Sequence, residues 1–130
     1  VKLILFLEKK LAENPEDFEG WKILARSCML AGYAQKANKY YLKALELVPE
    51  NRELLSEYAF FKKNNKKFSE SIIISEKINV IYPEDIDNLI FLTQLYSDTR
   101  NTKRFKELIE KLKSNNIDSQ IIEELIDSQK

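Results

Sequence analysis

The sequence of 130 residues has no histidine and a single cysteine, Cys28, and this scarcity excludes several kinds of site. Without histidine or a second cysteine, the chain lacks the usual zinc ligands, the Cys–His nucleophile pair and the redox-active cysteine pair. Only two glycines and three prolines occur, which disfavours folds rich in loops or β-hairpins and leaves no Gly-rich phosphate loop. We therefore expect a helical protein that is not an enzyme and needs neither cofactor nor metal.

The charge is balanced, with 21 Lys and Arg against 21 Asp and Glu. A neutral domain exerts no general attraction on nucleic acid or anionic lipid, so neither is an expected partner. The apolar run 3–7 is too short to span a bilayer, and we expect no direct membrane insertion by this fragment. Because the chain begins at Val1 rather than Met, we expect it to be a fragment of a longer protein, which leaves open a membrane anchor upstream.

The three prolines, Pro15, Pro49 and Pro83, are equally spaced along the chain. Each opens the same kind of tripeptide, Pro-Glu followed by Asp or Asn. Proline cannot continue a helix, and an acidic residue directly after it suits the positive end of the next helix. The shared interval, about 34 residues, is the length of a tetratricopeptide (TPR) unit, which is a pair of antiparallel helices. The period therefore predicts an all-α fold of stacked helix pairs.

The predicted architecture is one TPR domain over residues 1–130, an α-solenoid of about three helix-turn-helix repeats. We expect a leading helix in 1–14, repeats in 18–51, 52–85 and 86–116, and a closing helix in 117–130.

Two finer expectations concern the ends of this array. Leu3, Leu7 and Leu11 recur at every fourth position, which places them on a single face of the leading helix. In the third repeat, Phe105 lies three positions later than the period demands if it matches Phe68. We therefore expect the turn in that repeat to be lengthened by the same amount.

The first repeat carries much of the TPR signature, in Trp21, Leu24, Ala25, Cys28, Ala37, Tyr41, Ala44 and Pro49. The sequence around this signature resembles one particular branch of TPR proteins. The stretches 11–17, 20–26, 44–51 and 54–59 resemble the periplasmic TPR domain of bacterial cytochrome c-type biogenesis proteins of the CcmI/CycH kind. That resemblance implies an apocytochrome c chaperone on the periplasmic side of the inner membrane. Such a protein holds the C-terminal helix of unfolded cytochrome and presents it to the other haem-ligation subunits.

Two other functions remain open from the residues. One is a general TPR scaffold or assembly adaptor in a bacterial envelope or cytoplasmic complex, and the other is an accessory domain fused to an enzyme. The expected partner of the domain itself is a protein or a helical peptide.

In stacked repeats the first helix of each pair lines the concave face. The positions that face this groove combine apolar and charged side chains, as suits an amphipathic helix lying in a groove. The predicted peptide-binding residues are Lys22, Arg26, Met29, Ser56, Glu57, Phe60, Ile90, Phe91 and Gln94. The alternative for the aromatic and aliphatic members is packing between repeats. TPR domains that clamp a C-terminal carboxylate use Asn and Lys at set places, which here hold Arg26, Glu57, Asp87 and Phe91, so that mode is not expected.

Overall fold

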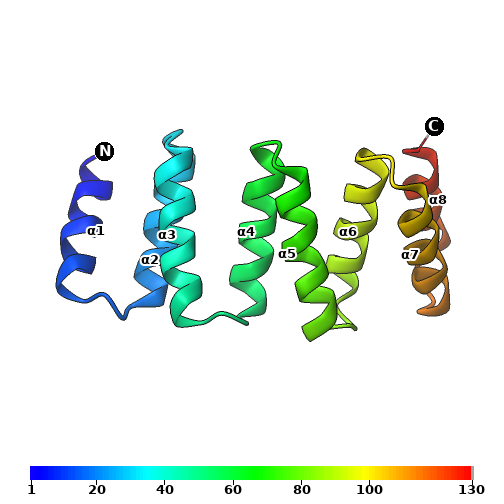
Figure 1. Ribbon diagram of the computed structural model, residues 1–130, viewed down its shortest axis with the longest axis horizontal. Helices are drawn as coiled ribbons and strands as arrows, with labels where there is room; N and C mark the ends of the chain where they lie inside the picture. The colour runs from blue at the N-terminus through cyan, green and yellow to red at the C-terminus, as the bar shows by residue number, and fades with distance from the viewer. Residues whose placement is uncertain (130) are drawn as a thin grey trace. The chain divides into compact units, whose positions relative to one another are not determined.

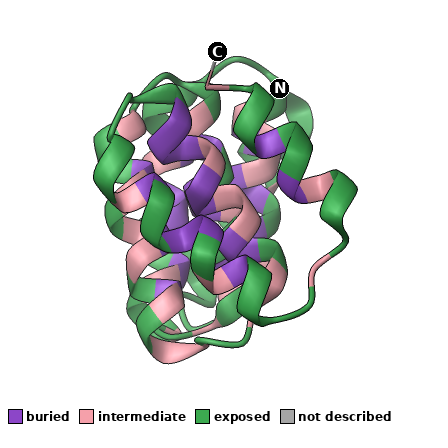
Figure 2. Cartoon of the chain, turned by 90° about the vertical axis from the view of Figure 1, so that its right-hand side faces the viewer, coloured by how far each residue is buried: buried purple, intermediate pink, exposed green. Residues whose placement is uncertain are grey.

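The computed structural model describes residues 1–129, and within them it contains eight α-helices and no strand (Figure 1). The helices are α1 (Lys2–Glu13), α2 (Phe18–Leu30), α3 (Ala34–Leu47), α4 (Arg52–Asn64), α5 (Phe68–Ile81), α6 (Ile86–Asp98), α7 (Thr102–Ser114) and α8 (Ser119–Asp127). Each helix carries both buried and exposed residues, which Figure 2 colours purple and green. The all-α prediction is confirmed.

The period set by the prolines holds through the third repeat. The first helices α2, α4 and α6 begin at Phe18, Arg52 and Ile86, and the second helices α3, α5 and α7 begin at the same interval from one another. The turn 99–101 therefore has the same length as the turns 31–33 and 65–67, and the predicted lengthening is wrong. The error came from matching one aromatic residue to another. Phe105 in fact takes the place of Ala37 and Ser71, and all three side chains are buried.

The recurring tripeptide acts chiefly through its third residue, which caps the helix that follows. The side chains of Asp17, Asn51 and Asp85 accept hydrogen bonds from the backbone N–H groups of Gly20, Leu54 and Asn88, at 3.0, 2.9 and 3.1 Å. Each bond satisfies one of the N–H groups that a helix leaves without an internal partner at its start. The proline ends one helix and the Asp or Asn begins the next.

The turn inside each repeat is fixed by one residue in the left-handed backbone region. These residues are Gly32 (φ 85°), Lys66 (φ 60°) and Arg100 (φ 60°), which occupy the same place in the three repeats. At the second turn the N–H of Lys67 donates to the carbonyl of Lys62 at 2.9 Å, and the other two turns make the equivalent bond. This is the Schellman termination, which favours glycine at the left-handed position.

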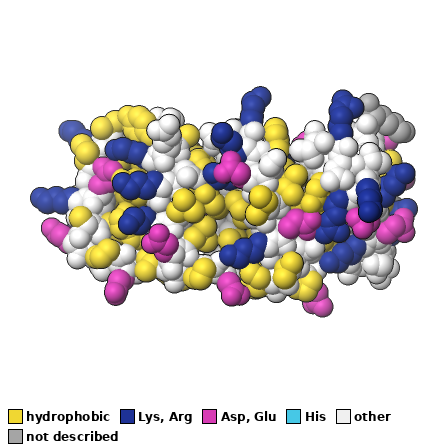
Figure 3. Space-filling view, viewed as in Figure 1, with side chains coloured by type: hydrophobic (Ala, Val, Ile, Leu, Met, Phe, Trp, Pro, Cys, Tyr) yellow, Lys and Arg dark blue, Asp and Glu magenta, His cyan; other side chains and the backbone are white. Residues whose placement is uncertain are grey.

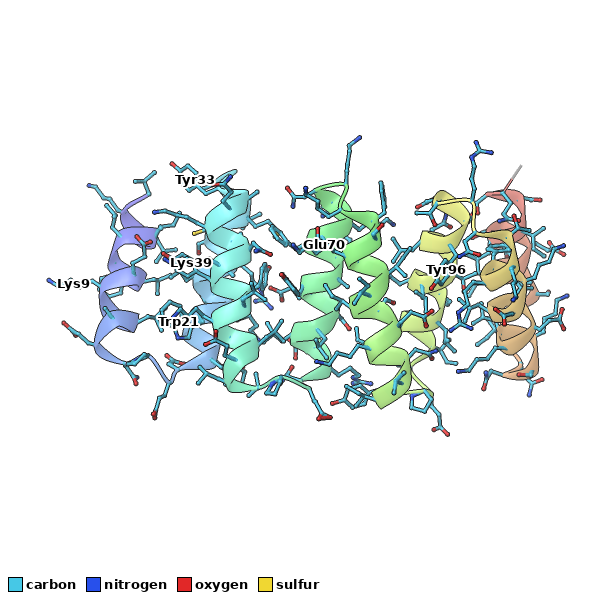
Figure 4. All side chains as sticks on the ribbon, in the orientation of Figure 1. Lys9, Trp21, Tyr33, Lys39, Glu70 and Tyr96 are labelled. Atoms are coloured by element: carbon cyan, nitrogen blue, oxygen red, sulfur yellow. The ribbon has the colours of Figure 1, made fainter. Side chains whose placement is uncertain are left out.

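The chain divides into two compact units, residues 1–61 and 62–130, and the boundary falls inside α4. In the first unit α2 packs against α3. Trp21 of α2, labelled in Figure 4, stacks on Tyr40 of α3 with ring centroids 5.6 Å apart. Tyr41 lies 5.6 Å from Tyr58 and 5.2 Å from Phe61, centroid to centroid. These rings join α2, α3 and α4 into one core.

In α1 the buried residues are Ile4 and Leu11, whereas Leu3 is 54% exposed. Of the three leucines that share one face in the sequence pattern, Leu11 is buried, Leu7 is partly buried and Leu3 is exposed. Recurrence at every fourth position does not by itself decide which side of a short, apolar helix meets the core.

The second unit has a core built from α6, α7 and α8. Its buried members are Leu89, Leu92, Tyr96, Phe105, Leu108, Ile109, Leu112, Ile122 and Leu125. Two polar groups are also buried, and they satisfy each other, because Ser75 donates to the side-chain oxygen of Asn88 at 2.7 Å and the Asn88 amide donates to the Ser75 carbonyl at 3.0 Å. The last helix contributes Ile122 and Leu125 to this core and exposes Glu123, Glu124 and Asp127.

Candidate peptide-binding surface

The nine predicted residues all lie on the first helices α2, α4 and α6. Six of them belong to the first unit: Lys22, Arg26, Met29, Ser56, Glu57 and Phe60. The other three, Ile90, Phe91 and Gln94, belong to the second. On the face drawn in Figure 3, where α3 lies in front of α2, acidic and basic side chains are interspersed with hydrophobic ones.

Arg26 and Glu57 form the most ordered polar contact of the first unit. Arg26 donates through Nε to Glu57 Oε2 at 2.8 Å and through Nη2 to Glu57 Oε1 at 2.5 Å. The hydroxyl of Tyr41 donates to the same Oε2 at 2.8 Å. A two-pronged arginine–carboxylate bond fixes direction as well as distance. It therefore holds α2 against α4, while Tyr41 ties α3 to both.

The pKa directions agree with this geometry. The hydrogen bond to Glu57 raises the pKa of Arg26, against the opposing effect of burial. Burial, and then the hydrogen bond to Glu57, raises the pKa of Tyr41. The Arg26 side chain is 43% exposed and that of Glu57 is 18% exposed. The Arg26 side chain is thus partly exposed to solvent while its guanidinium is held in one direction by Glu57.

Lys22 differs from its expected place on a polar rim, because only 9% of its side chain is exposed. Its ammonium lies 3.1 Å from a carboxylate oxygen of Glu19 and 3.8 Å from one of Glu53. The aliphatic stem is covered, and the charge is shared between two acidic groups that are themselves exposed. Helical spacing in the sequence could not show this enclosure.

Phe60 is the large apolar side chain that the surface offers on α4. It is 51% exposed, whereas its neighbour Phe61 is 3% exposed. Ile23 on α2 is 45% exposed, and it was outside the nine predicted residues although it directly follows Lys22. Met29 is partly buried and Ser56 is exposed. Exposed apolar side chains of this size on the first helices are suitable anchors for a partner.

In the second unit the predicted residues are more enclosed. Ile90 is partly buried and packs against the core of α6, α7 and α8. The ammonium of Lys63 lies 5.4 Å from the ring centroid of Phe91, a cation–π contact that the sequence did not reveal. Gln94 donates to Asp98 at 2.9 Å. Of these three residues, Ile90 contributes to the core as well as to the predicted binding surface.

A second carboxylate is held in the same way on the second helices. Arg104 donates to Glu76 through Nε at 3.0 Å and Nη2 at 2.8 Å, and the Tyr96 hydroxyl donates to Glu76 at 2.6 Å. Burial alone would raise the pKa of Glu76, but the bonds from Arg104 and Tyr96 outweigh it and lower that pKa. Burial and the bond to Glu76 raise the pKa of Tyr96 to about 12. Helical spacing offers no signal of this cluster, because its members come from three different helices.

Cys28 is fully buried, and burial raises the pKa of its thiol, so it packs as a small apolar residue. Within residues 1–129 no cluster of three or more Cys, Asp or Glu side chains could hold a metal ion. Among the described helices, none is both long and apolar enough to cross a membrane.

Comparison with known proteins gives the same fold and one related sequence. No family model matches the chain. It is 27% identical over 108 residues to the cytochrome c-type biogenesis protein CcmH of Escherichia coli K12, and the match to the Shigella flexneri protein of that name is the same. The match covers 83% of this chain and 31% of the relative.

Among solved structures, MamA superposes with a TM-score of 0.71 at 19% identity, covering 87% of this chain and 68% of MamA. The TPR domain of Sgt2 from Aspergillus fumigatus superposes with a TM-score of 0.68 at 20% identity, covering 87% of this chain and 77% of that domain. At these identities the likeness concerns the fold. The chain therefore has the tetratricopeptide-repeat fold, and in sequence it resembles a cytochrome c-type biogenesis protein.

Proposed function

We propose that this domain is a protein-binding module of cytochrome c maturation that holds a helical segment of an apocytochrome c. The segment is its C-terminal helix, which the domain presents to the other haem-ligation subunits on the periplasmic side of the bacterial inner membrane. The domain binds and positions its partner and performs no chemistry itself.

The sequence match to CcmH carries this proposal, because it extends over 83% of the chain rather than over one repeat. The matched part makes up 31% of the relative, so the function proposed concerns the TPR portion.

The surface of the first helices is chemically suited to a helical partner. Phe60 and Ile23 offer apolar contact area, and Arg26 offers a partly exposed side chain whose guanidinium Glu57 holds in one direction. An amphipathic helix recognises such a surface by placing its apolar face on the anchors and its polar flank on the charges. A pre-fixed side chain also loses less conformational entropy when a partner binds.

The experiment is a calorimetric titration of the domain with a peptide from the C-terminal helix of an apocytochrome c of the same organism. A peptide of the same composition in scrambled order has the same charge but no apolar face. We expect binding at about micromolar affinity or tighter for the natural peptide and none for the scrambled one.

Equal binding of both peptides would mean non-specific association and would contradict the proposal. No binding of either peptide would also contradict it, and would favour a general scaffold or assembly adaptor.

A further inference from the structure

The leading helix α1 has the register of the second helix of a repeat. It ends at Glu13, which lies one repeat period before Leu47, the last residue of α3. The next residue, Asn14, has φ −137° and ψ 70°, the same values as Val48 after α3. The position at which α1 ends and the backbone conformation of the residue after it therefore match those of α3, the second helix of a complete repeat.

An ion pair between α1 and α3 independently supports the assignment of α1 as a second helix. Glu8 of α1 accepts a bond from Lys36 of α3 at 3.4 Å, and Glu76 of α5 accepts one from Arg104 of α7. Each member of the second pair lies two repeat periods after the corresponding member of the first. Each carboxylate also accepts a hydrogen bond from a tyrosine, Tyr40 or Tyr96. Thus α1 contacts α3 as one second helix contacts the next.

In complete repeats, one face of the second helix is covered by the first helix of its own pair. On α3 this face consists of Ala37, Tyr40 and Ala44, and on α7 of Phe105, Leu108 and Leu112. All six are at most 6% exposed. The equivalent residues of α1 are Leu3, Phe6 and Lys10, of which Leu3 is 54% and Phe6 57% exposed.

We propose that a further chain segment, one repeat period ahead of α2, precedes Val1 and covers the face of α1 made by Leu3, Phe6 and Lys10. That segment forms a first helix antiparallel to α1 and completes a fourth repeat. Because Leu3 and Phe6 are apolar, its contacting residues are apolar. Since Lys10 occupies a position that is buried in α3 and α7, the segment carries an Asp or Glu opposite it.

The test compares residues 1–130 with the same chain extended by its natural preceding residues, using amide hydrogen exchange of α1. We expect the α1 amides to exchange at least about tenfold more slowly in the extended chain. The probe variant is Phe6→Lys. The matched control is Leu5→Lys, because Leu5 is 60% exposed and its equivalents Lys39, Ile73 and Glu107 are all exposed. In Figure 4 the neighbouring Lys9 likewise points away from α2 and α3.

In the extended chain, Phe6→Lys should return α1 exchange to the rate seen in residues 1–130, whereas Leu5→Lys should leave it slow. Unchanged exchange on extension would overturn the proposal. Dimerisation of the extended chain that Phe6→Lys abolishes would also overturn it, since a second copy would then cover the face. Neither outcome depends on apocytochrome binding.

Discussion

The guanidinium of Arg26 and the carboxylate of Glu57 join the first helices of two successive repeats through two parallel hydrogen bonds, 2.8 and 2.5 Å long. The same carboxylate accepts the hydroxyl of Tyr41, a side chain with no exposed surface. The residue that orients a surface cation thus also satisfies a buried hydroxyl group. Removing Glu57 should therefore affect stability and binding together.

We expect Glu57→Ala to lower the free energy of unfolding by about 2 kcal/mol, because it leaves the buried Tyr41 hydroxyl without its acceptor. Urea denaturation measures the change. A double-mutant cycle with Tyr41→Phe isolates the contact. Tyr41→Phe should destabilise the Glu57→Ala protein less than it destabilises the natural one. Equal effects in both backgrounds would show that the two groups are not coupled.

The Glu76 cluster should make stability fall at both ends of the pH range. The pKa of Glu76 is lower in the folded protein than its ordinary value of 4.5, so its contribution is complete above pH 4.5 and is lost as pH falls through the folded value. The pKa of Tyr96 is raised from 10.0 to about 12, so its contribution is complete below pH 10 and is lost as pH rises towards 12.

Urea unfolding across pH tests the acid limb, and tyrosinate absorbance tests the alkaline one. Tyr96→Phe should remove one tyrosine titration near pH 12 and flatten the alkaline loss of stability. An unchanged alkaline profile in Tyr96→Phe would assign that loss to other tyrosines.

Lys66→Gly and Arg100→Gly should each stabilise the protein by about 0.5–1 kcal/mol, because a left-handed conformation costs a non-glycine residue more than glycine loses in entropy on folding. Both residues have φ 60°. The urea midpoint should rise for both. Lys67→Gly is the control, because Lys67 has φ −93° and gains nothing from glycine. A fall in stability for all three variants would refute the strain argument.

Asp85→Ala should lower the free energy of unfolding by about 1 kcal/mol, since the Asp85 carboxylate caps α6 through the N–H of Asn88. Glu84→Ala alters the exposed residue beside it, and should change stability by less than about 0.5 kcal/mol. Thermal unfolding of both variants measures the two changes in stability. Similar losses for both would mean that the tripeptide acts through its overall charge and not through the cap.

Much of the fold could be predicted because one signal recurs. A proline, an acidic residue and a capping residue recur at one fixed interval. Because proline cannot continue a helix, each proline indicates where a helix ends. The third repeat was misaligned because Phe105 replaces a small residue, so residue type pointed to the wrong match. The turns are equally long because Lys66 and Arg100 adopt the left-handed conformation that ends each preceding helix. Their residue types do not indicate this conformation.

The site was less predictable than the fold. Helical spacing identified Phe60 as a surface position, and the structure shows it half exposed. The same spacing could not show that Lys22 is enclosed or that Glu57 is shared between Arg26 and Tyr41. Such facts depend on side-chain reach between helices, which one-dimensional spacing does not contain.

The most direct measurement is calorimetric titration of Phe60→Ala with the apocytochrome helix peptide. Ile73→Ala serves as the control, because Ile73 is 69% exposed on a second helix, α5, outside the predicted surface. We expect Phe60→Ala to weaken binding by more than about 1 kcal/mol with an unchanged unfolding midpoint, and Ile73→Ala to leave both unchanged. Equal affinity for natural and Phe60→Ala proteins would contradict binding at the first helices.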